Sequence, residues 1–205
     1  MLRSLPCPLP QDAALLVINL QRAIDNPSLG VRNNLDAERN VAALLEAWRS
    51  SHRPIYHIRH DSSQVASPYR PGQPGHEFKP EAQPLRREAV LGKRTNSAFI
   101  GTDLEARLRA GQQTLLVVAG AITNNCVEAT VRMAGNLGFD TFLVEDCCFT
   151  FARQDWNGQL HSASEVHAMS LANLDGEYCT VTRTSEVLAA LHNSRVSSDE
   201  MIETR

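Results

Sequence analysis

The stretch GAITNNCVEAT, residues 120–130, places a cysteine where it is suited to nucleophilic chemistry. An apolar run precedes Cys126 and an amphipathic segment follows it, so we expect the thiol in the first turn of a helix that follows a strand. Unpaired backbone N–H groups and the positive end of the helix dipole favour a thiolate there, and they can also hold an oxyanion. A cysteine in this setting is suited to attack a carbonyl group.

Two further polar residues stand at the ends of predicted strands. Asn19 ends the run ALLVIN, and Lys93 ends the run EAVLGK. A lysine ammonium near Cys126 would stabilise a thiolate and later carry a proton. Each residue alone also has a structural interpretation: the cysteine as an apolar filler, the lysine as a solvated loop residue and the asparagine as a turn residue. Spacing alone does not choose between the structural and the catalytic interpretation.

The remaining cysteines have no comparable setting. The N-terminal residues contain no apolar run of signal-peptide type, and the longest apolar stretches fall far below the ~20 residues of a membrane span. We therefore expect a cytoplasmic protein without a membrane partner. In that compartment, five cysteines without a C-x-x-C spacing predict neither a disulfide framework nor a zinc site. The four cysteines expected to be comparatively inert are Cys7, Cys147, Cys148 and Cys179.

Composition limits the class of protein. The chain has 205 residues, 42% of them hydrophobic, and no low-complexity stretch divides it. We expect one domain over residues 1–205, with its core at about 12–190. The formal net charge is −3 and the basic residues are scattered, which argues against a nucleic-acid partner. The expected partner is a small-molecule substrate.

Short apolar runs alternate with amphipathic segments along the chain. This alternation predicts a three-layer α/β/α fold with a central, mostly parallel sheet and right-handed crossovers. In such sheets the ligand crevice lies beyond the carboxyl ends of the strands. The sequence T-x-x-E from Thr102 to Glu105 predicts a capping box at the start of the second helix. The expected strands are 14–19, 54–60, 88–93, 114–121, 140–147 and 178–184, and the expected helices include 41–48, 102–112, 123–138, 163–173 and 185–193.

Three segments together resemble the isochorismatase-like cysteine hydrolases, the Rossmann-like superfamily that contains nicotinamidase and N-carbamoylsarcosine amidase. They are ALLVINLQ, LGKRTNSAFIGTDLEARLRAG and LLVVAGAITNNCVEATVRMAGNLGFDTFLVEDCC. The resemblance covers roughly residues 12–190 and favours the catalytic interpretation of the cysteine. Its most specific parts are G-x-x-T-x-x-C-V-x-x-T-x-R and K-x-x-x-S-A-F-x-G-T, formed by Gly120, Thr123, Cys126, Val127, Thr130 and Arg132 and by Lys93, Ser97, Phe99 and Thr102.

The resemblance implies a mechanism and residue roles. Cys126 would attack a carboxamide or ureido carbonyl to give a thioester that water hydrolyses, and Lys93 would be its cationic partner. A cis peptide bond would join Ala121 to Ile122, and the Ile122 and Cys126 amides would form the oxyanion hole. Relatives commonly assemble as dimers or tetramers, so a homodimer or homotetramer is expected.

The first strand departs from the family pattern. Asn19 stands where the family has a catalytic aspartate, and a carboxamide is no base near neutral pH. One alternative is an amidohydrolase in which the lysine and the helix dipole sustain some turnover. The other is a non-catalytic member that binds a small molecule or serves as an oligomeric scaffold. Asp25, six residues further on, is a weaker candidate for a substitute base.

Metal chemistry is not expected. Nicotinamidases of this type hold a metal with a D-x-H spacing after the second strand, and the segment HIRHDSS lacks it. His57 and His60 are therefore interpreted as hydrogen-bonded polar residues, and no cofactor is predicted. True isochorismate hydrolases use no cysteine nucleophile, so the retained Cys126 favours C–N bond hydrolysis. The substrate is expected to be selected by the loops 61–84 and 149–158; candidate lining residues are Arg59, Tyr69, Arg70, Phe99, Phe151 and Trp156.

Overall fold

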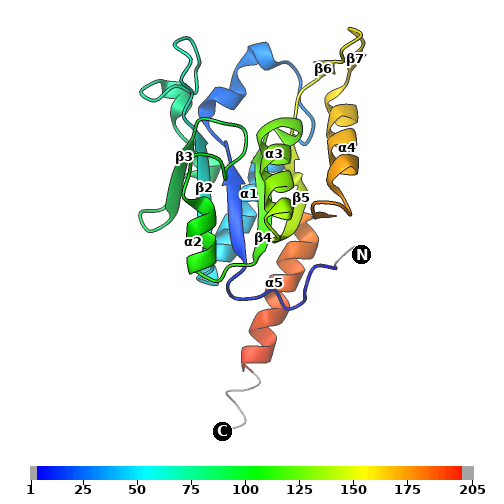
Figure 1. Ribbon diagram of the computed structural model, residues 1–205. Coiled ribbons are helices and arrows are strands. Elements are labelled where there is room, and N and C mark those ends of the chain that lie inside the picture. Colours follow the sequence, from blue (N-terminus) through cyan, green and yellow to red (C-terminus); the bar gives the residue numbers. More distant parts are fainter. Residues whose placement is uncertain (1–3, 200–205) are drawn as a thin grey trace.

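The structure, a computed structural model, describes residues 4–199 and is built around a six-stranded sheet (Figure 1). Every neighbouring pair of strands in this sheet is parallel, in the order β3-β2-β1-β4-β5-β8. The predicted α/β class with a central parallel sheet is confirmed. The strands are β1 (Ala14–Ile18), β2 (Ile55–His60), β3 (Ala89–Lys93), β4 (Leu115–Ala121), β5 (Asp140–Phe149) and β8 (Thr180–Thr182).

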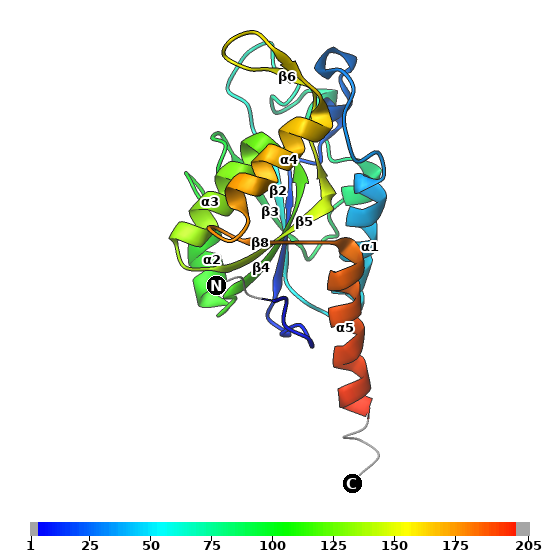
Figure 2. The ribbon, with the colours of Figure 1, turned by 90° about the vertical axis from the view of Figure 1, so that its right-hand side faces the viewer.

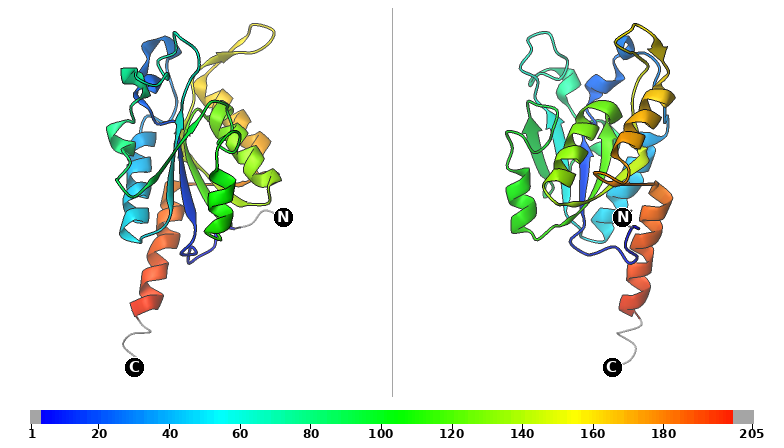
Figure 3. Two further views of the ribbon diagram at one scale, coloured as in Figure 1. Left: turned by 60° about the vertical axis from the view of Figure 1, so that its left-hand side comes forward. Right: turned by 45° about the vertical axis from the view of Figure 1, so that its right-hand side comes forward.

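Helices cover both faces of the sheet (Figures 2 and 3). Side chains alternate along β1, so Leu15 packs in the core beneath α1 and α5, while Leu16 packs in the core beneath α2, α3 and α4. The two central strands, β1 and β4, are buried along their whole length and are continuously apolar, as is typical of parallel strands covered on both faces. The helices are α1 (Ala37–Ser50), α2 (Leu104–Ala110), α3 (Glu128–Asn136), α4 (Ala163–Leu174) and α5 (Thr184–Asp199).

The connections at the carboxyl ends of the strands carry short elements of their own. Strands β6 (Arg153–Gln154) and β7 (Leu160–His161) form a two-stranded antiparallel hairpin that projects beyond the sheet (Figure 1). This hairpin was not predicted. Between residues 4 and 199, none of the helices combines the length and the apolar character that a membrane crossing requires. The 3₁₀ segments of the described part of the chain are Arg22–Asp25, Pro27–Leu29, Pro74–His76 and Pro80–Ala82.

The predicted capping box at Thr102 is wrong. The Thr102 hydroxyl accepts from the Leu104 amide, two residues on, and donates to the Ala98 carbonyl, so it closes a turn before the helix. Helix α2 consequently begins at Leu104. A capping box does occur at α4, where Ser162 Oγ accepts from the Glu165 amide at 3.3 Å and the Glu165 carboxylate accepts from the Ser162 amide at 2.7 Å.

A close contact between backbones aligns β1 with β4. Ile18 is paired with Gly120, which has φ +125°, a conformation that L side chains rarely adopt. A Cβ atom at Gly120 would lie 2.1 Å from the Ile18 carbonyl oxygen. Because backbone cannot move aside as a side chain can, only glycine fits between the two strands here.

We predict that Gly120→Ala destabilises the protein more than Gly138→Ala does. Gly138 also has a positive φ, +81°, but no atom lies within 4 Å of the site of its Cβ. The control should lose about 1–2 kcal/mol from left-handed strain. Gly120→Ala should lose a further ~1–3 kcal/mol from overpacking. Urea denaturation followed by circular dichroism measures both, and equal losses would show that the backbone contact is unimportant.

Candidate active site

A cavity of about 200 Å³ lies beyond the carboxyl ends of the central strands. Its walls come from the residues at the ends of β1, β2 and β4, from the loops after β2 and β3, and from the turn that carries Cys126. The cavity is therefore where a doubly wound parallel sheet places its ligands. The lining residues are Asn19, His60, Ser62, Gln64, Ser67, Tyr69, Asn96, Ala121, Ile122, Asn125 and Cys126.

Cys126 lies in a widened turn rather than in a regular α-helical turn. The turn spans Thr123–Val127, and its Val127 amide donates to the Ile122 carbonyl five residues earlier at 3.3 Å. Regular α3 begins immediately afterwards. Such single π-turns occur frequently at functional sites. The cis peptide bond expected between Ala121 and Ile122 is present, so that prediction is confirmed.

Two buried threonine hydroxyl groups fix the turn at both ends. Thr123 Oγ1 shares a 2.9 Å hydrogen bond with His167 Nδ1 of α4. Thr130 Oγ1 donates to the Cys126 carbonyl at 2.7 Å and accepts from the Ala98 amide at 3.0 Å. The position of the cysteine therefore depends on α4 and on the segment that follows Lys93.

Lys93 reaches Cys126 from the end of β3. Its Nζ donates to Cys126 Sγ at 3.3 Å and to the Thr95 carbonyl at 3.0 Å, and the residue is only 1% exposed. Burial lowers the pKa of Lys93, while the interactions with Cys126 and Asp61 act in the opposite direction. The sulfur also contacts Asn96 Oδ1 at 3.9 Å. The structure thus pairs the thiol with a buried amine that can give or take a proton.

Asn19 is held beside this pair by its backbone. Its amide donates to the Ile58 carbonyl at 2.8 Å, and its φ of +52° is a left-handed conformation that asparagine tolerates. The residue is 6% exposed, it lines the cavity, and its Oδ1 has no hydrogen-bond partner. The three residues predicted from the sequence therefore meet at one edge of the sheet. None of the described lining residues is a carboxylate.

His60 is a cavity residue that the sequence analysis did not identify. It pairs in register with Lys93, and its buried Nδ1 has no hydrogen-bond partner. Burial and the nearby Lys93 charge lower its pKa, so the ring is neutral near pH 7. The interpretation as a hydrogen-bonded polar residue is correct for His57, whose Nε2 lies 2.8 Å from a Glu88 carboxylate oxygen. It is wrong for Nδ1 of His60.

The loop after β2 supplies one wall, as the prediction for residues 61–84 required. Tyr69 lines the cavity, and its ring packs edge-on against His60 with the centroids 5.8 Å apart. Burial raises the pKa of Tyr69, so its hydroxyl remains protonated near neutral pH. Ser62, Gln64 and Ser67 complete this wall. The second predicted loop, 149–158, supplies no lining residue.

Five of the six predicted lining residues do not line the cavity, and Arg70 and Phe151 are two of them. The other three have defined positions elsewhere. Arg59 donates to the Asp61 carboxylate at 3.0 Å, which holds it outside the cavity. Phe99 stacks on Phe139 in the core, with the ring centroids 5.7 Å apart. Trp156 is 93% exposed on the β6–β7 hairpin, where it lines a separate groove of about 950 Å³. Residue type and position in the chain did not reveal these side-chain directions.

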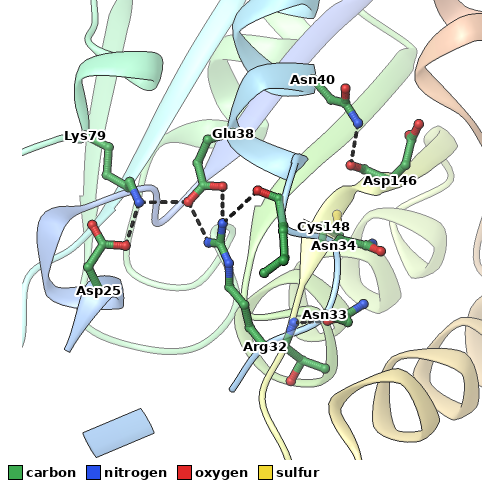
Figure 4. Close-up of polar contacts among 11 residues, drawn as sticks. Asp25, Arg32, Asn33, Asn34, Glu38, Asn40, Lys79, Asp146 and Cys148 are labelled. Atoms are coloured by element: carbon green, nitrogen blue, oxygen red, sulfur yellow. Dashed lines mark hydrogen bonds and ion pairs between the residues drawn. The ribbon is translucent and has the colours of Figure 1, made fainter. Parts of the chain in front are cut away.

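A buried ion-pair network anchors the loop that follows β1 (Figure 4). Lys79 Nζ donates to Asp25 at 2.6 Å and to Glu38 at 2.8 Å, and Arg32 binds both oxygens of Glu38. Burial disfavours both charges, but these bonds outweigh it, raising the pKa of Lys79 and lowering that of Glu38. Asp25, the weaker candidate for a substitute base, thus forms an ion pair with Lys79 and does not line the cavity.

Asparagine side chains tie the next part of this loop to the end of β5 (Figure 4). Asn34 Nδ2 donates to the Cys148 carbonyl at 2.7 Å, and Asn33 Oδ1 accepts from the Thr150 amide at 2.8 Å. The Thr150 hydroxyl in turn donates to Asn124 Oδ1 at 2.6 Å. The anchored loop therefore contacts the strand end that supports the Cys126 turn.

Fold and site together define an α/β protein with a buried cysteine–lysine pair at the carboxyl edge of a parallel sheet. The family model of the Isochorismatase domain matches residues 13–186 of this chain. The chain belongs to the isochorismatase family, whose members are hydrolases.

Two similar proteins cover most of the chain, and a third covers part of it. A crystal structure of an isochorismatase-family protein from Chromobacterium violaceum is 59% identical, with a TM-score of 0.89, over 92% of this chain and 99% of that one. The isochorismatase family protein YrdC of Bacillus subtilis is 37% identical over 85% of this chain and 94% of its own length. Maleamate amidohydrolase of Pseudomonas putida is 30% identical over 60% of this chain and 52% of its own length.

We predict that Cys126 reacts first with limiting iodoacetamide near pH 7. Its sulfur adjoins both the cavity and the Lys93 ammonium, which stabilises negative charge on it. Burial raises the pKa values of Cys147 and Cys148, and that of Cys179 to about 12, so these thiols should react slowly. Peptide mapping after brief treatment measures the order.

The exposed Cys7 provides an internal control in the same experiment. Lys93→Met should slow labelling of Cys126 severalfold and leave the rate at Cys7 unchanged, because only Cys126 contacts the amine. Faster labelling of Cys7 than of Cys126 in the wild-type protein would argue against an activated thiol.

Proposed function

We propose that this protein hydrolyses a C–N bond of a small amide or ureide, with Cys126 as the nucleophile. The observation that carries the proposal is the 3.3 Å contact between Lys93 Nζ and Cys126 Sγ beside a cavity that includes polar side chains in its lining. A thiolate needs such a cation nearby and a space next to the sulfur for the carbonyl group. The cavity provides that space.

The proposed reaction proceeds in two stages. The Cys126 thiolate forms a bond to the carbonyl carbon, and the carbonyl π electrons move to oxygen to give an oxyanion. The amides of Ile122 and Cys126 are the proposed donors to this oxyanion. When the carbonyl re-forms, the C–N bond breaks and the leaving nitrogen takes a proton from Lys93. Water then hydrolyses the thioester, releasing the acid and restoring the thiol.

Lys93 is the proposed proton carrier because no carboxylate lines the described cavity. Burial lowers its pKa, which brings an amine closer to the range where it can exchange protons. In this scheme the Lys93 amine takes the thiol proton and the resulting ammonium later protonates the leaving nitrogen. Asn19 accepts hydrogen bonds but takes no proton.

The family relationship supports an amide substrate. The relative named maleamate amidohydrolase acts, by its name, on an amide. The retained Cys126 also favours C–N hydrolysis, since thioester formation is a route for acyl transfer. These points favour hydrolysis of an amide C–N bond.

The absent carboxylate at residue 19 favours a second candidate function. A protein with the cavity, the thiol and the amine but without an efficient base would bind a small amide and turn it over slowly or not at all. The two candidates differ only in their rate of chemistry, so turnover separates them.

We predict that wild-type protein hydrolyses at least one member of a panel of small primary amides, N-carbamoyl compounds and hydroxamates. Cys126→Ala should abolish this turnover, because the substitution removes the attacking sulfur while preserving the rest of the cavity. Ammonia release or mass spectrometry of the acid product measures the rate. Turnover that survives in Cys126→Ala would contradict the cysteine mechanism.

We predict that Asn19→Asp raises turnover by ~10²–10⁴-fold, the usual contribution of a positioned general base. The change preserves the shape of the side chain and places a proton acceptor beside the thiol. Activity in Asn19→Asp but none in wild type would identify the natural protein as a binder. An unchanged or lower rate in the variant would show that the amide at residue 19 is part of a working site.

A further inference from the structure

Helix α4 contacts the Cys126 turn through a buried histidine. The helix lies alongside α3, which continues the turn (Figures 2 and 3). His167 and Ser170 are three positions apart on α4 and so project from one face. Ser170 Oγ donates to Glu128 Oε2 of α3 at 2.6 Å. His167 Nδ1 reaches the turn itself, through its 2.9 Å hydrogen bond with the hydroxyl of Thr123, the first residue of the turn.

The bond between Thr123 and His167 is enclosed by protein. Thr123 is fully buried and His167 is 6% exposed, so solvent cannot readily replace either partner. Within the described residues, His167 is the only hydrogen-bond partner of the Thr123 hydroxyl. A hydroxyl can donate or accept, so the bond forms with either tautomer of a neutral imidazole. Removal of the ring nitrogen would leave a buried hydroxyl unpaired.

The other ring nitrogen of His167 makes no hydrogen bond to a described residue. Nε2 lies 3.7 Å from Glu145 Oε2, beyond hydrogen-bond reach, and the other Glu145 oxygen pairs with Arg183 Nε at 3.2 Å. Burial lowers the pKa of His167 and outweighs the opposite effect of Glu145, so the ring is neutral near pH 7. Substitution of His167 therefore removes no charge from the surroundings of the thiol.

The backbone alone gives the widened turn little support. A single acceptor, the Ile122 carbonyl, takes the Asn125 amide at 3.0 Å and the Val127 amide at 3.3 Å. Asn124 departs from helical geometry, with φ −81° and ψ 16°. A turn with a shared acceptor and an irregular residue depends on side-chain contacts from outside, and Thr123 supplies one at its start.

We infer that His167 is a positioning residue for Cys126: its bond to Thr123 holds the turn in the form that keeps the sulfur at Lys93. Neither Thr123 nor His167 is among the residues that line the cavity, so the bond acts on the thiol and not on a bound ligand. The inference rests on the proposed function only for the use that the protein makes of this thiol. It extends the site to α4, which the proposed reaction does not otherwise involve.

The first test measures iodoacetamide labelling of Cys126 near pH 7, which needs no substrate, with the exposed Cys7 as the internal reference. His167→Phe keeps a ring but removes the bond, and labelling should slow about fivefold, the effect of one hydrogen bond. His167→Asn places a polar atom close to the position of Nδ1 and should label as the wild-type protein does. Ser170→Ala is the matched control, because it removes a bond from α4 to α3 and not to the turn, and the rate should be unchanged.

A double variant separates position from stability. Thr123→Val and His167→Phe each leave one polar group of the pair buried without its partner, so each should lower stability to urea. Thr123→Val/His167→Phe leaves neither, and most of the lost stability should return. If the bond were merely structural, the labelling rate at Cys126 would return with the stability. A positioning bond requires that labelling stays slow in the folded double variant.

The outcomes separate this inference from the proposed hydrolysis. Labelling at the wild-type rate in His167→Phe overturns the inference, as does a recovered rate in the double variant. Slow labelling in both supports it, whether or not the protein turns over an amide. Absence of wild-type turnover counts against the hydrolase alone. Where turnover is found, His167→Phe should lower kcat about fivefold and leave KM unchanged, and a raised KM with unchanged kcat would also overturn the inference.

Discussion

The close backbone contact between Ile18 and Gly120 is the constraint on which the site depends. It sets the register of β1 against β4, and the residues directly after this pair are Asn19 on one strand and Ala121 on the other. Both strands end at the same level of the sheet, and the cavity lies next to these two strand ends. Strand pairing thus brings the candidate site residues, which are far apart in sequence, to the same edge of the sheet.

The same principle extends across the sheet to the lysine. β2 lies between β1 and β3, and its pairing places His60 level with Lys93, whose amine contacts the sulfur of Cys126. The loops that close the cavity are themselves held by buried bonds. The Lys79–Glu38–Arg32 network fixes the segment after β1, and Tyr69 packs on His60 from the loop after β2. The polar cavity is therefore largely pre-formed.

The sequence predicted the elements better than the directions of side chains. Apolar runs revealed all six strands of the main sheet because a buried parallel strand must be apolar on both faces. The short hairpin Arg153–His161 was missed because its polar, two-residue strands carry no such pattern. Cys126 and Lys93 were identified by their motif and by their place at strand ends. His60 was missed because a histidine at a strand end has the same sequence signature in a cavity as in the core. Phe99 and Trp156 were assigned wrongly because the type of an aromatic residue does not show whether its side chain packs in the core, as Phe99 does, or lies in solvent, as Trp156 does.

The left-handed backbone at Asn19 has a consequence for how this site can change over generations. Apart from glycine, asparagine and aspartate are among the residues that most readily adopt a φ of +52°. They differ only in that the NH₂ group of asparagine is an oxygen atom in aspartate. A single nucleotide exchange interconverts their codons. A single mutation at this position can therefore replace a neutral hydrogen-bond acceptor with a carboxylate that accepts protons. The backbone conformation and the surrounding sheet need not change.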